Sequence, residues 1–571
     1  MPHELVFLVG GGLAVIITAA VLSRRTGVAA PLLLLALGVG AAYLPNVPEV
    51  EVDPELILAG VLPPLLYASA VRMPIIDLRR NFGLIAWLSV GLVITSAVVV
   101  GLVVHALFPQ VPLALGIALG AVLSPTDAVA ATAIGKRLGL PPRLMTVLEG
   151  ESLVNDASAL VVLRAALAAV SVGTFSLGQT ALSFLWAVVA AVVVGLVVGR
   201  LTVLLRARLD DPVLNTTISF AVPFLAFFPS EELEASGVLA VVVAGLVTGH
   251  MAPRHFTAHD RHSEATNWAT VNFVLESAVF LLMGLELPAL VDDASGQGSA
   301  GDLWLLVAVL VGLLVVLRFL GVGVPLLLSR AGRQDRLERT EAWAGEFGDR
   351  LDAWEPETET QEMRLEQLQR RLARTSADVA FKRREPITRR GGLVIAWAGM
   401  RGVVTLAAAQ SIPAGTEHRS FLVLAAFMVS VTTLVGFGGT LPWLIRRTGL
   451  TARPARTRNA ELGQLMTQLG QRTVEVVGPM SEVRVDGKPL DPEMVEWLSS
   501  RFVPLLRGVS VGLKQRKPGS WERAQIVQRR YLSAMQEALW EERSIGAYPS
   551  GTYAAAQALL DREERRLNPL D

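Results

Sequence analysis

Long runs of apolar residues dominate the first 450 positions of this 571-residue chain, and most charges lie between the runs or in the C-terminal tail. A helix needs about 20 residues to cross the hydrocarbon of a membrane, which is close to the length of each run. A segment in lipid must also satisfy its own backbone hydrogen bonds, so each run is predicted to be a transmembrane helix. The thirteen predicted runs lie at about 4–22, 27–44, 54–71, 81–108, 111–134, 145–170, 179–205, 212–229, 233–250, 268–289, 303–328, 391–412 and 420–445.

The charges of the loops alternate along the chain. The odd-numbered loops are basic, whereas the intervening loops are short and neutral or acidic, apart from Arg419 in the last of them. Because cytoplasmic loops carry an excess of Lys and Arg, the N-terminus is predicted outside and the C-terminus in the cytoplasm of a multi-pass cell-membrane protein. No basic region precedes the first run and no small-residue cleavage site follows it, which indicates a retained helix rather than a signal peptide. The basic residues are Arg24, Arg25, Arg72, Arg79, Arg80, Lys136, Arg137, Arg143, Arg200, Arg206, Arg208, Arg254 and Arg261, and a dense cluster follows the eleventh run.

Two charged segments are predicted to lie in the cytoplasm. The predicted divisions are 1–330 with eleven helices, an insert at 331–390, the last two helices at 391–447, and a helical, regulatory C-terminal domain at 448–571. One face of the insert indicates either a solvated linking helix or a helix that docks a partner. The apolar positions behind these predictions are Met363, Leu365, Leu368 and Leu372 in the insert, and Tyr531, Leu532, Met535 and Leu539 in the tail.

Two of the apolar runs contain a sequence that interrupts a helix. The fifth reads "LSPTDAVA", in which Pro125 removes a backbone donor and predicts a break between Ser124 and Asp127. The twelfth reads "AGMRGVV", in which Gly399 and Gly402 flank Arg401. A break within the membrane is tolerated where it lines a cavity or is buried in protein. Freed carbonyls beside Asp127 would form a cation site of hard oxygens, although Asp127 as a simple helix cap would have the same geometry.

The sixth run, "LEGESLVNDASALVV", carries more polar groups than a lipid-facing helix tolerates. Ser152 and Asp156 are four residues apart and share one helical face, and Glu151 and Asn155 share the neighbouring face. A buried carboxylate needs a permanent cationic partner or an exchangeable counter-ion, and ionisable residues inside membranes usually mark ion pathways. Arg401 is the candidate partner for Glu151 or Asp127.

Two further charges lie inside predicted helices. Glu276 belongs to the tenth run and Arg318 to the eleventh, and they are predicted to be structural neighbours. Thirteen runs can also divide into six, one linker and six, which gives two halves of inverted topology with the interrupted fifth and twelfth runs at matching positions. Paired interruptions of this kind point to the midplane site of a secondary transporter.

Five motifs carry a resemblance to a known family. They are "LEGESLVNDASALV", "LSPTDAVA", "LPPLLYASA" at Leu62, "ESAVFLLMGL" at Glu276 and "AGMRGVVTLAAA" at Ala398. Together, over about residues 5–447, they resemble the NhaP-type and NHE-type monovalent cation/proton antiporters. The resemblance implies an all-α membrane fold of the NhaA-like kind, with thirteen helices, two of them discontinuous and crossing. It also implies a dimerisation domain, a mobile six-helix core and a homodimer.

The resemblance also implies roles for individual residues. Asp156 would be the essential carboxylate that binds either Na⁺ or H⁺, and Asn155 would go with electroneutral exchange. Asp127, the Thr126 carbonyl and Ser152 would complete the Na⁺ ligands, and Glu151 would pair with Arg401. Many relatives carry a glutamate where this chain has Ala68, which affects ion affinity or the choice between Na⁺ and K⁺.

These observations predict a secondary transporter without a resident cofactor, which exchanges Na⁺, or Li⁺ or K⁺, for H⁺. A K⁺-selective antiporter is the alternative of the same fold. A channel would be expected to carry a filter motif or rings of charge, and neither is present in the sequence. An intramembrane enzyme is disfavoured because no "HExxH" and no "GxSxG" within a run occurs, and zero net charge argues against a nucleic-acid partner. The absence of cysteine excludes disulfides and thiolate metal sites. Four histidines, His250, His255, His259 and His262, are predicted to lie in a solvated loop, with pH sensing or metal binding as the alternative.

Overall fold

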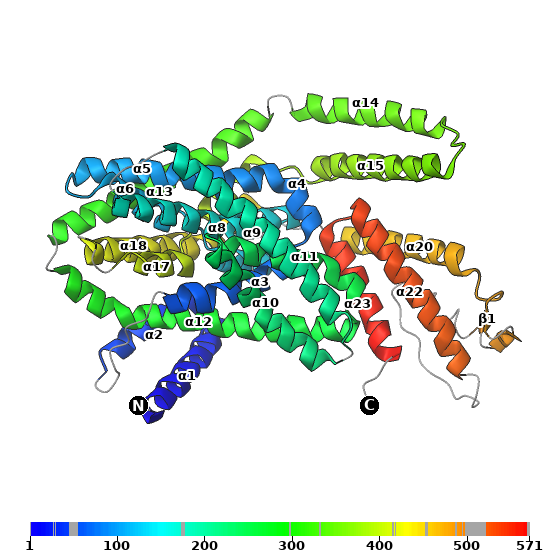
Figure 1. Ribbon diagram of the computed structural model, residues 1–571, viewed down its shortest axis with the longest axis horizontal. Helices are drawn as coiled ribbons and strands as arrows, with labels where there is room; N and C mark the ends of the chain where they lie inside the picture. Colours follow the sequence, from blue (N-terminus) through cyan, green and yellow to red (C-terminus); the bar gives the residue numbers. More distant parts are fainter. Residues whose placement is uncertain are drawn as a thin grey trace. The chain divides into compact units, whose positions relative to one another are not determined.

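Helices account for nearly all of the described chain in the computed structural model (Figure 1). Apart from one antiparallel pair of two-residue strands, β1 (Arg484–Val485) and β2 (Lys488–Pro489), the elements of the described residues are helical, which confirms the predicted all-α class. Most of the acidic loop predicted at 45–55 and the tail residues 497–520 lie outside the described residues. The structure describes residues 2–26, 28, 30–44, 55–172, 177–209, 211–295, 299–330, 333–413, 416, 418–450, 455–485, 488–493, 495–496 and 521–567.

The chain divides into two compact units. The first comprises Met1–His250, Glu264–Leu328 and Ile387–Thr451, and the second comprises Met251–Ser263, Ser329–Pro386 and Ala452–Asp571. The boundaries predicted at 330, 390 and 447 separate membrane from cytoplasmic segments, whereas these units are defined by packing, so the boundaries stay predictions. The sequence did not indicate that 251–263 packs with the insert and the tail.

Apolar helices form the first unit. Eight helical stretches of the described residues are long and apolar enough to cross a membrane, and α2, α3 and α6 are shorter apolar helices. The helices are α1 (Pro2–Thr26), α2 (Ala30–Ala42), α3 (Leu62–Arg72), α4 (Ile75–Ala86), α5 (Leu92–Leu107), α6 (Leu113–Leu123), α7 (Ala128–Leu138), α8 (Pro142–Val172), α9 (Leu177–Arg206), α10 (Pro212–Glu232), α11 (Gly237–His255), α12 (Ala258–Ser295), α13 (Ala300–Arg330), α16 (Arg389–Trp397), α17 (Val403–Gln410), α18 (Arg419–Thr433) and α19 (Gly439–Thr448). Three π-helical turns, η1 (Leu56–Val61), η2 (Trp87–Gly91) and η3 (Leu434–Gly438), continue into α3, α5 and α19.

Local sequence determines where several helices begin and end. The Asp211 carboxylate accepts hydrogen bonds from the backbone N–H groups of Val213 and Leu214, and Pro212 occupies the first position of α10, where no N–H is needed. The Thr388 hydroxyl caps α16 by accepting from the Gly391 N–H. Gly449 ends α19 with a φ of 64°, a left-handed conformation that glycine adopts without strain.

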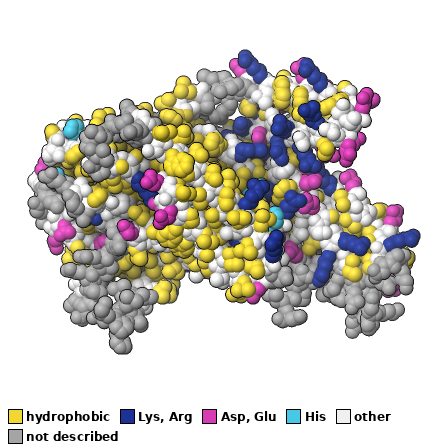
Figure 2. Space-filling view, in the orientation of Figure 1, with side chains coloured by type: hydrophobic (Ala, Val, Ile, Leu, Met, Phe, Trp, Pro, Cys, Tyr) yellow, Lys and Arg dark blue, Asp and Glu magenta, His cyan; other side chains and the backbone are white. Residues whose placement is uncertain are grey.

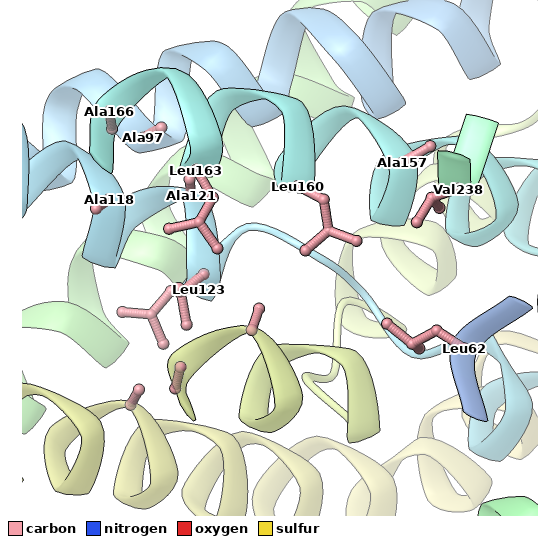
Figure 3. Close-up of a cluster of buried hydrophobic side chains, with 14 of the residues drawn as sticks. Leu62, Ala97, Ala118, Ala121, Leu123, Ala157, Leu160, Leu163, Ala166 and Val238 are labelled. Carbon is pink, nitrogen blue, oxygen red and sulfur yellow. The ribbon is translucent and has the colours of Figure 1, made fainter. Parts of the chain in front are cut away.

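A cluster of small and branched apolar side chains fills the interior of the first unit (Figure 3). Leu123 at the end of α6 and Leu160 and Leu163 on α8 are buried in it. Figure 3 shows the ribbon narrowing after Leu123 into the extended stretch between α6 and α7. Alanines such as Ala97, Ala118 and Ala121 let α5 and α6 approach closely, so the break in α6–α7 lies inside protein rather than in lipid.

Large apolar side chains cover the outer surface of the first unit. On α9, Leu182, Trp186 and Leu201 are 69%, 55% and 61% exposed. Figure 2 shows broad hydrophobic areas on this face of the molecule, with few charges among them. Water would not tolerate so large an apolar surface, so it indicates contact with lipid.

The second unit contains amphipathic helices. The insert forms α14 (Arg333–Asp352) and α15 (Glu359–Arg384), which pack together, and the tail contains α20 (Ala455–Val477), α22 (Trp521–Ile545) and α23 (Ser550–Leu567). Arg383 of α15 pairs with Glu341 of α14 at 2.7 Å. The four apolar tail positions singled out from the sequence, Tyr531, Leu532, Met535 and Leu539, are all buried, and α15 contacts α22.

The close contact of α5 and α6 makes a first prediction. A Cβ atom on Gly120 would lie 2.6 Å from the Ala97 carbonyl oxygen and 2.7 Å from the Ala97 Cα, and this backbone cannot move aside. We expect Gly120→Val to destabilise the protein by about 1–3 kcal/mol through overpacking, measured as a lower temperature of thermal unfolding in detergent. Gly312→Val is the control, because a Cβ there meets no atom within 4 Å. Equal unfolding temperatures for the two variants would contradict the packing described.

Candidate functional site

Two interrupted helices lie at the centre of the first unit. Residues Ser124–Asp127 separate α6 from α7, and Ala398–Gly402 separate α16 from α17, as predicted from Pro125 and from the paired glycines. The Asp127 backbone N–H donates to the Met400 carbonyl at 2.7 Å, so the two breaks contact each other directly. A Cβ atom on Gly402 would overlap the Asp127 carboxylate, which therefore lies against the first residue before α17. Glycine is required at 402 because of this close approach.

Arg401 stabilises the C-terminal ends of α6 and α16, the helices that precede the two breaks. Its Nε donates to the Leu123 carbonyl at 2.9 Å, at the end of α6, and its Nη1 donates to the Gly399 carbonyl at 2.5 Å, just after α16. Helix C-termini carry partial negative charge and unpaired carbonyls, which a buried guanidinium satisfies. The Asp127 carboxylate lies beside the opposite, positive ends, where α7 and α17 begin. The crossing is thus neutralised by one cation and one anion.

The predicted ion pair between Glu151 and Arg401 is wrong. Arg318 of α13 makes the pair instead, with both terminal nitrogens on the Glu151 carboxylate and a further hydrogen bond to the Ile395 carbonyl at 3.1 Å. Arg318 is 4% and Glu151 1% exposed, so neither charge is shielded by water. Arg401 is committed to helix-end carbonyls, which explains why a cation from another helix is needed.

A hydrogen-bonded chain continues from this ion pair. The Thr126 hydroxyl donates to Glu151 Oε1 at 3.1 Å and accepts from Asn155 Nδ2 at 2.7 Å. Asn155 is 1% exposed and does not line the cavity described next. The structure therefore places Asn155 behind the break, where it holds Thr126, rather than beside Asp156 in the cavity.

A cavity of about 430 Å³ lies on the other side of the break. Its walls come from two sets of helices. The bundle set, α4–α8, α13 and α16–α19, is held together by the contacts of the two interrupted helices, and the scaffold set, α2, α3 and α9–α12, by contacts such as α9 with α10 and α10 with α3. Helix α8 contacts α3 and α9 across the two sets. The bundle side supplies four of the predicted ion-binding residues, and α3 and α12 form the facing wall. The cavity-lining residues predicted from sequence are Thr126, Asp127, Ser152 and Asp156.

Asp156 is the most deeply buried of the cavity carboxylates. Its side chain belongs to α8 and is 6% exposed, whereas Asp127 and Glu276 are half-buried. An isolated negative charge in such surroundings is costly and requires a proton or a cation to neutralise it. Within the described residues, no three His, Asp or Glu side chains converge as they would around a resident metal ion.

Glu276 does not pair with Arg318, which corrects the second predicted pair. Arg318 is occupied by Glu151, and Glu276 lines the cavity from α12, with Asn272 Nδ2 donating to its Oε2 at 3.4 Å. Helical spacing placed Glu276 inside the protein but did not show which way the side chain pointed. A third carboxylate therefore faces the cavity, opposite Asp127 and Asp156.

Sequence reasoning missed several polar groups in this region. Thr405 of α17 is fully buried and lines the cavity, and its hydroxyl has no hydrogen-bond partner among the described residues. Asn272, Ser69 and Thr132 also line it. Ala68, the position that is often acidic in relatives, is buried on α3 and is not among the lining residues. A threonine in an apolar run gives no signal of its own, which is why Thr405 was not noticed.

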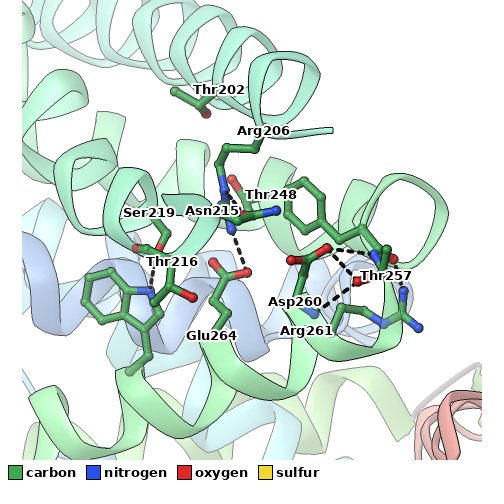
Figure 4. A network of polar contacts seen from close by, with 12 residues as sticks. Thr202, Arg206, Asn215, Thr216, Ser219, Thr248, Thr257, Asp260, Arg261 and Glu264 are labelled. Carbon is green, nitrogen blue, oxygen red and sulfur yellow. Dashed lines mark hydrogen bonds and ion pairs between the residues drawn. The ribbon is translucent and has the colours of Figure 1, made fainter. Parts of the chain in front are cut away.

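A second buried ion pair involves Arg206, a residue that the sequence predicts to lie in a basic loop. Arg206 was counted among the basic loop residues, but it is fully buried and contacts Glu264 at 2.8 Å and Asn215 at 2.7 Å (Figure 4). The Trp268 indole also donates to the Ser219 hydroxyl, at 3.0 Å. These contacts join α9, α10 and α12, so this network holds the scaffold set together.

The mouth of the cavity carries charges that reach solvent. Lys136 pairs with Glu149 at 3.0 Å, and their side chains are 69% and 34% exposed. Arg72 lines the same end of the cavity. Arg72 and Lys136 belong to the basic segments that the sequence predicts to be cytoplasmic.

Comparisons with known proteins agree with this architecture. A profile described as "Sodium/hydrogen exchanger, transmembrane" matches residues 12–349. An uncharacterized Na⁺/H⁺ exchanger of Mycobacterium tuberculosis is 29% identical over 574 residues, covering 98% of this chain and 95% of that protein. A sodium, potassium, lithium and rubidium/H⁺ antiporter of Bacillus subtilis is 32% identical, covering 51% of this chain and 45% of that protein.

A solved structure shares the fold. The sodium proton antiporter MjNhaP1 from Methanocaldococcus jannaschii matches 78% of this chain and 99% of its own, with a TM-score of 0.57 and 16% identity. At this identity the likeness concerns the fold alone.

The corrected ion pair gives a second prediction. Removing one partner of a buried ion pair costs about 3–5 kcal/mol, because the other charge stays buried without compensation. We expect Glu151→Gln and Arg318→Met each to lower thermal stability and the double variant to lose much less than their sum. A parallel double-mutant cycle with Glu151 and Arg401 is the control, since coupling measured this way reports contact between the two residues. Strong coupling to Arg401 and none to Arg318 would contradict the pairing.

Proposed function

Because this chain belongs to the sodium/hydrogen exchanger family, we propose that it exchanges Na⁺ for H⁺ across the cell membrane, one for one, by alternating access. Asp156 would bind either cation in turn. The observation that carries the proposal is the position of this carboxylate, deeply buried yet lining an open cavity beside the crossing of two interrupted helices. Interrupted helices with their ends at such a site are typical of secondary transporters.

The proposed coupling needs only one exchangeable site. With a proton or a cation on Asp156 the site is electrically neutral and the bundle can carry it across the hydrocarbon. With neither, an uncompensated charge would have to be moved through a region of low dielectric, which is costly. Competition of H⁺ and Na⁺ for the same oxygens would thus give obligatory exchange. Asn155, being uncharged, adds no second exchangeable charge, which supports electroneutral 1:1 stoichiometry.

The proposed ligands of the transported cation are oxygens from α8 and from the break between α6 and α7, which meet at the cavity. Asp156 and Ser152 come from α8, and Asp127 and the Thr126 carbonyl come from the break between α6 and α7. Their common position on the cavity wall supports this assignment. Glu151 and Arg318 are proposed to be structural, since each is satisfied by the other.

The proposal extends to topology and assembly. We propose thirteen membrane crossings in two inverted halves, an external N-terminus, a cytoplasmic C-terminus and a homodimer. The eight long apolar helices and the shorter ones between them support the crossings. The basic residues at the cavity mouth support a state that is open to the cytoplasm.

The choice of cation is proposed to be broader than Na⁺. The relative in Bacillus subtilis is named for sodium, potassium, lithium and rubidium. Carboxylate, hydroxyl and carbonyl oxygens are hard ligands that bind several alkali ions. A K⁺-preferring exchanger with the same site is the alternative, and adding Na⁺, Li⁺ and K⁺ in turn to proteoliposomes that contain a pH-sensitive dye distinguishes the two.

A third prediction concerns Asp156. We expect Asp156→Asn to reduce cation-driven proton flux in proteoliposomes to the level of empty liposomes, because an amide binds neither H⁺ nor Na⁺ at this site. The variant should still enter the membrane and elute from a size-exclusion column like wild type, since the amide has the shape of the carboxyl group. Wild-type exchange by this variant would disprove the assignment.

A fourth prediction concerns Glu276. When ionised, this carboxylate should attract cations across the cavity without binding the exchanged proton. At an alkaline assay pH, where the group is ionised, Glu276→Gln is therefore expected to raise the KM for Na⁺ about 5-fold, or roughly 1 kcal/mol for a charge acting through water, with little change in maximal rate. Glu232→Gln is the matched control, because Glu232 is exposed and does not line the cavity. Loss of maximal rate at unchanged KM would show that Glu276 has a different role.

A further inference from the structure

Segment 251–263, which comprises the end of α11, the connection to α12 and the first turns of α12, is bound by the C-terminal tail. Arg261 pairs with Asp561 of α23 and lies 3.8 Å from Glu564 of the same helix. Arg254 pairs with Glu537 of α22 at 3.2 Å, and its guanidinium stacks 4.5 Å above the Trp540 ring. All these residues belong to the second unit. We call this set of contacts the clasp.

The tail also completes the start of α12. Thr257 and Asp260 cap the helix reciprocally, with the Asp260 N–H donating to the Thr257 hydroxyl and the Thr257 N–H donating to Asp260 Oδ2 (Figure 4). The next N–H, that of Ala258, donates to Glu564 Oε1 of the tail at 3.0 Å. Gln536 of α22 donates to the other oxygen of Glu564 at 2.6 Å and so fixes its position. Carboxylates at a helix N-terminus are stabilised by the helix dipole.

The contacts of the clasp differ in strength. The side chains of Arg254 and Glu537 are 47% and 51% exposed, and a pair of this kind contributes little. Arg261 and Asp561 are only 13% and 17% exposed, and the Arg261 guanidinium also donates to the carbonyl of Phe256, which lies between α11 and α12. The pair of Arg261 with Asp561 and the cap by Glu564 therefore account for most of the attachment.

Chain connectivity gives the clasp a mechanical consequence. Segment 251–263 is continuous with α11 and α12, which belong to the scaffold set. The insert is continuous with α13 and α16, and the tail follows α19, all of which belong to the bundle set. Helix α15 of the insert also packs on α22 of the tail. The clasp thus joins a segment that is continuous with the scaffold set to a tail that is continuous with the bundle set.

We propose that the clasp is an intramolecular docking site for the chain's own tail and that it restrains exchange. This inference rests on the proposed function, because alternating access requires the bundle set to move against the scaffold set. While Asp561 and Glu564 hold Arg261 and the start of α12, that motion is opposed. Release of the tail frees it.

The test measures the initial rate of Na⁺-driven proton flux by the full-length protein in proteoliposomes. Asp561→Asn combined with Glu564→Gln removes both charges and keeps the shapes of the side chains. We expect the rate to rise about 5-fold, the lower end of ordinary allosteric coupling. Glu475→Gln, at an exposed position of α20, is the matched control and should leave the rate unchanged.

A second measurement does not depend on the folding of that variant. The chain has no cysteine, so Arg261→Cys with Asp561→Cys introduces a unique pair of thiols. Before cross-linking, the double-cysteine variant should exchange faster than wild type. A short bismaleimide should return its rate of proton flux to the wild-type value or below. The same treatment should not lower the rate of either single-cysteine variant. Unchanged rates in both experiments, with normal wild-type exchange, would overturn the clasp alone. Absence of exchange by the wild type would instead overturn the proposed function.

Discussion

The crossing of the two interrupted helices is the constraint on which the rest of the structure depends. Each break exposes backbone groups that lipid cannot satisfy, and each therefore needs partners inside the protein. The Asp127 N–H on the Met400 carbonyl and the Arg401 guanidinium on the carbonyls of Leu123 and Gly399 supply them. The small side chains of α5 and α6 keep lipid away from this point. The fold and the site therefore depend on the same contacts, because the groups that satisfy the breaks also position the residues of the cavity.

Burial alone does not distinguish a structural carboxylate from an exchangeable one. Glu151 and Asp156 are five residues apart on α8, and both are buried. Glu151 has a permanent cation in Arg318, and Thr126 adds a hydrogen bond, so its charge is balanced without any ion. Asp156 instead lines a cavity that reaches solvent. The difference in partners, rather than in depth, supports the two roles proposed for these carboxylates.

Much of the fold could be predicted from the sequence, and the reasons are local. Apolar runs predict helices, Pro125 predicts a break, and the motif order indicates the family, whose match is confirmed. The partners of the buried charges are harder to predict from the sequence. Glu151 was assigned to Arg401 and Glu276 to Arg318, because spacing along a helix shows which face a residue shares but not which helix lies opposite. The sequence predicts Arg206 in a loop, because the same residue pattern occurs at a helix end whether the arginine is solvated or, as here, buried against Glu264.

The two helix sets and the second unit suggest how transport could be both fast and controlled. The cavity lies between the bundle and scaffold sets. In the proposed mechanism a shift of one set against the other changes access to the cavity, while the contacts within each set persist. In the proposed regulation, a tail that is attached to the start of α12 and joined by the chain to the bundle set opposes that shift.

The central claim is that protons and alkali ions compete for one carboxylate, and counting the protons released when Na⁺ binds to the purified protein tests it most directly. In weakly buffered detergent solution, a pH indicator should report one proton released for each Na⁺ bound. The apparent affinity for Na⁺ should also fall about tenfold for each unit that the pH is lowered in the range where the site is protonated. Saturable Na⁺ binding that releases no proton, with an affinity independent of pH, would contradict the account.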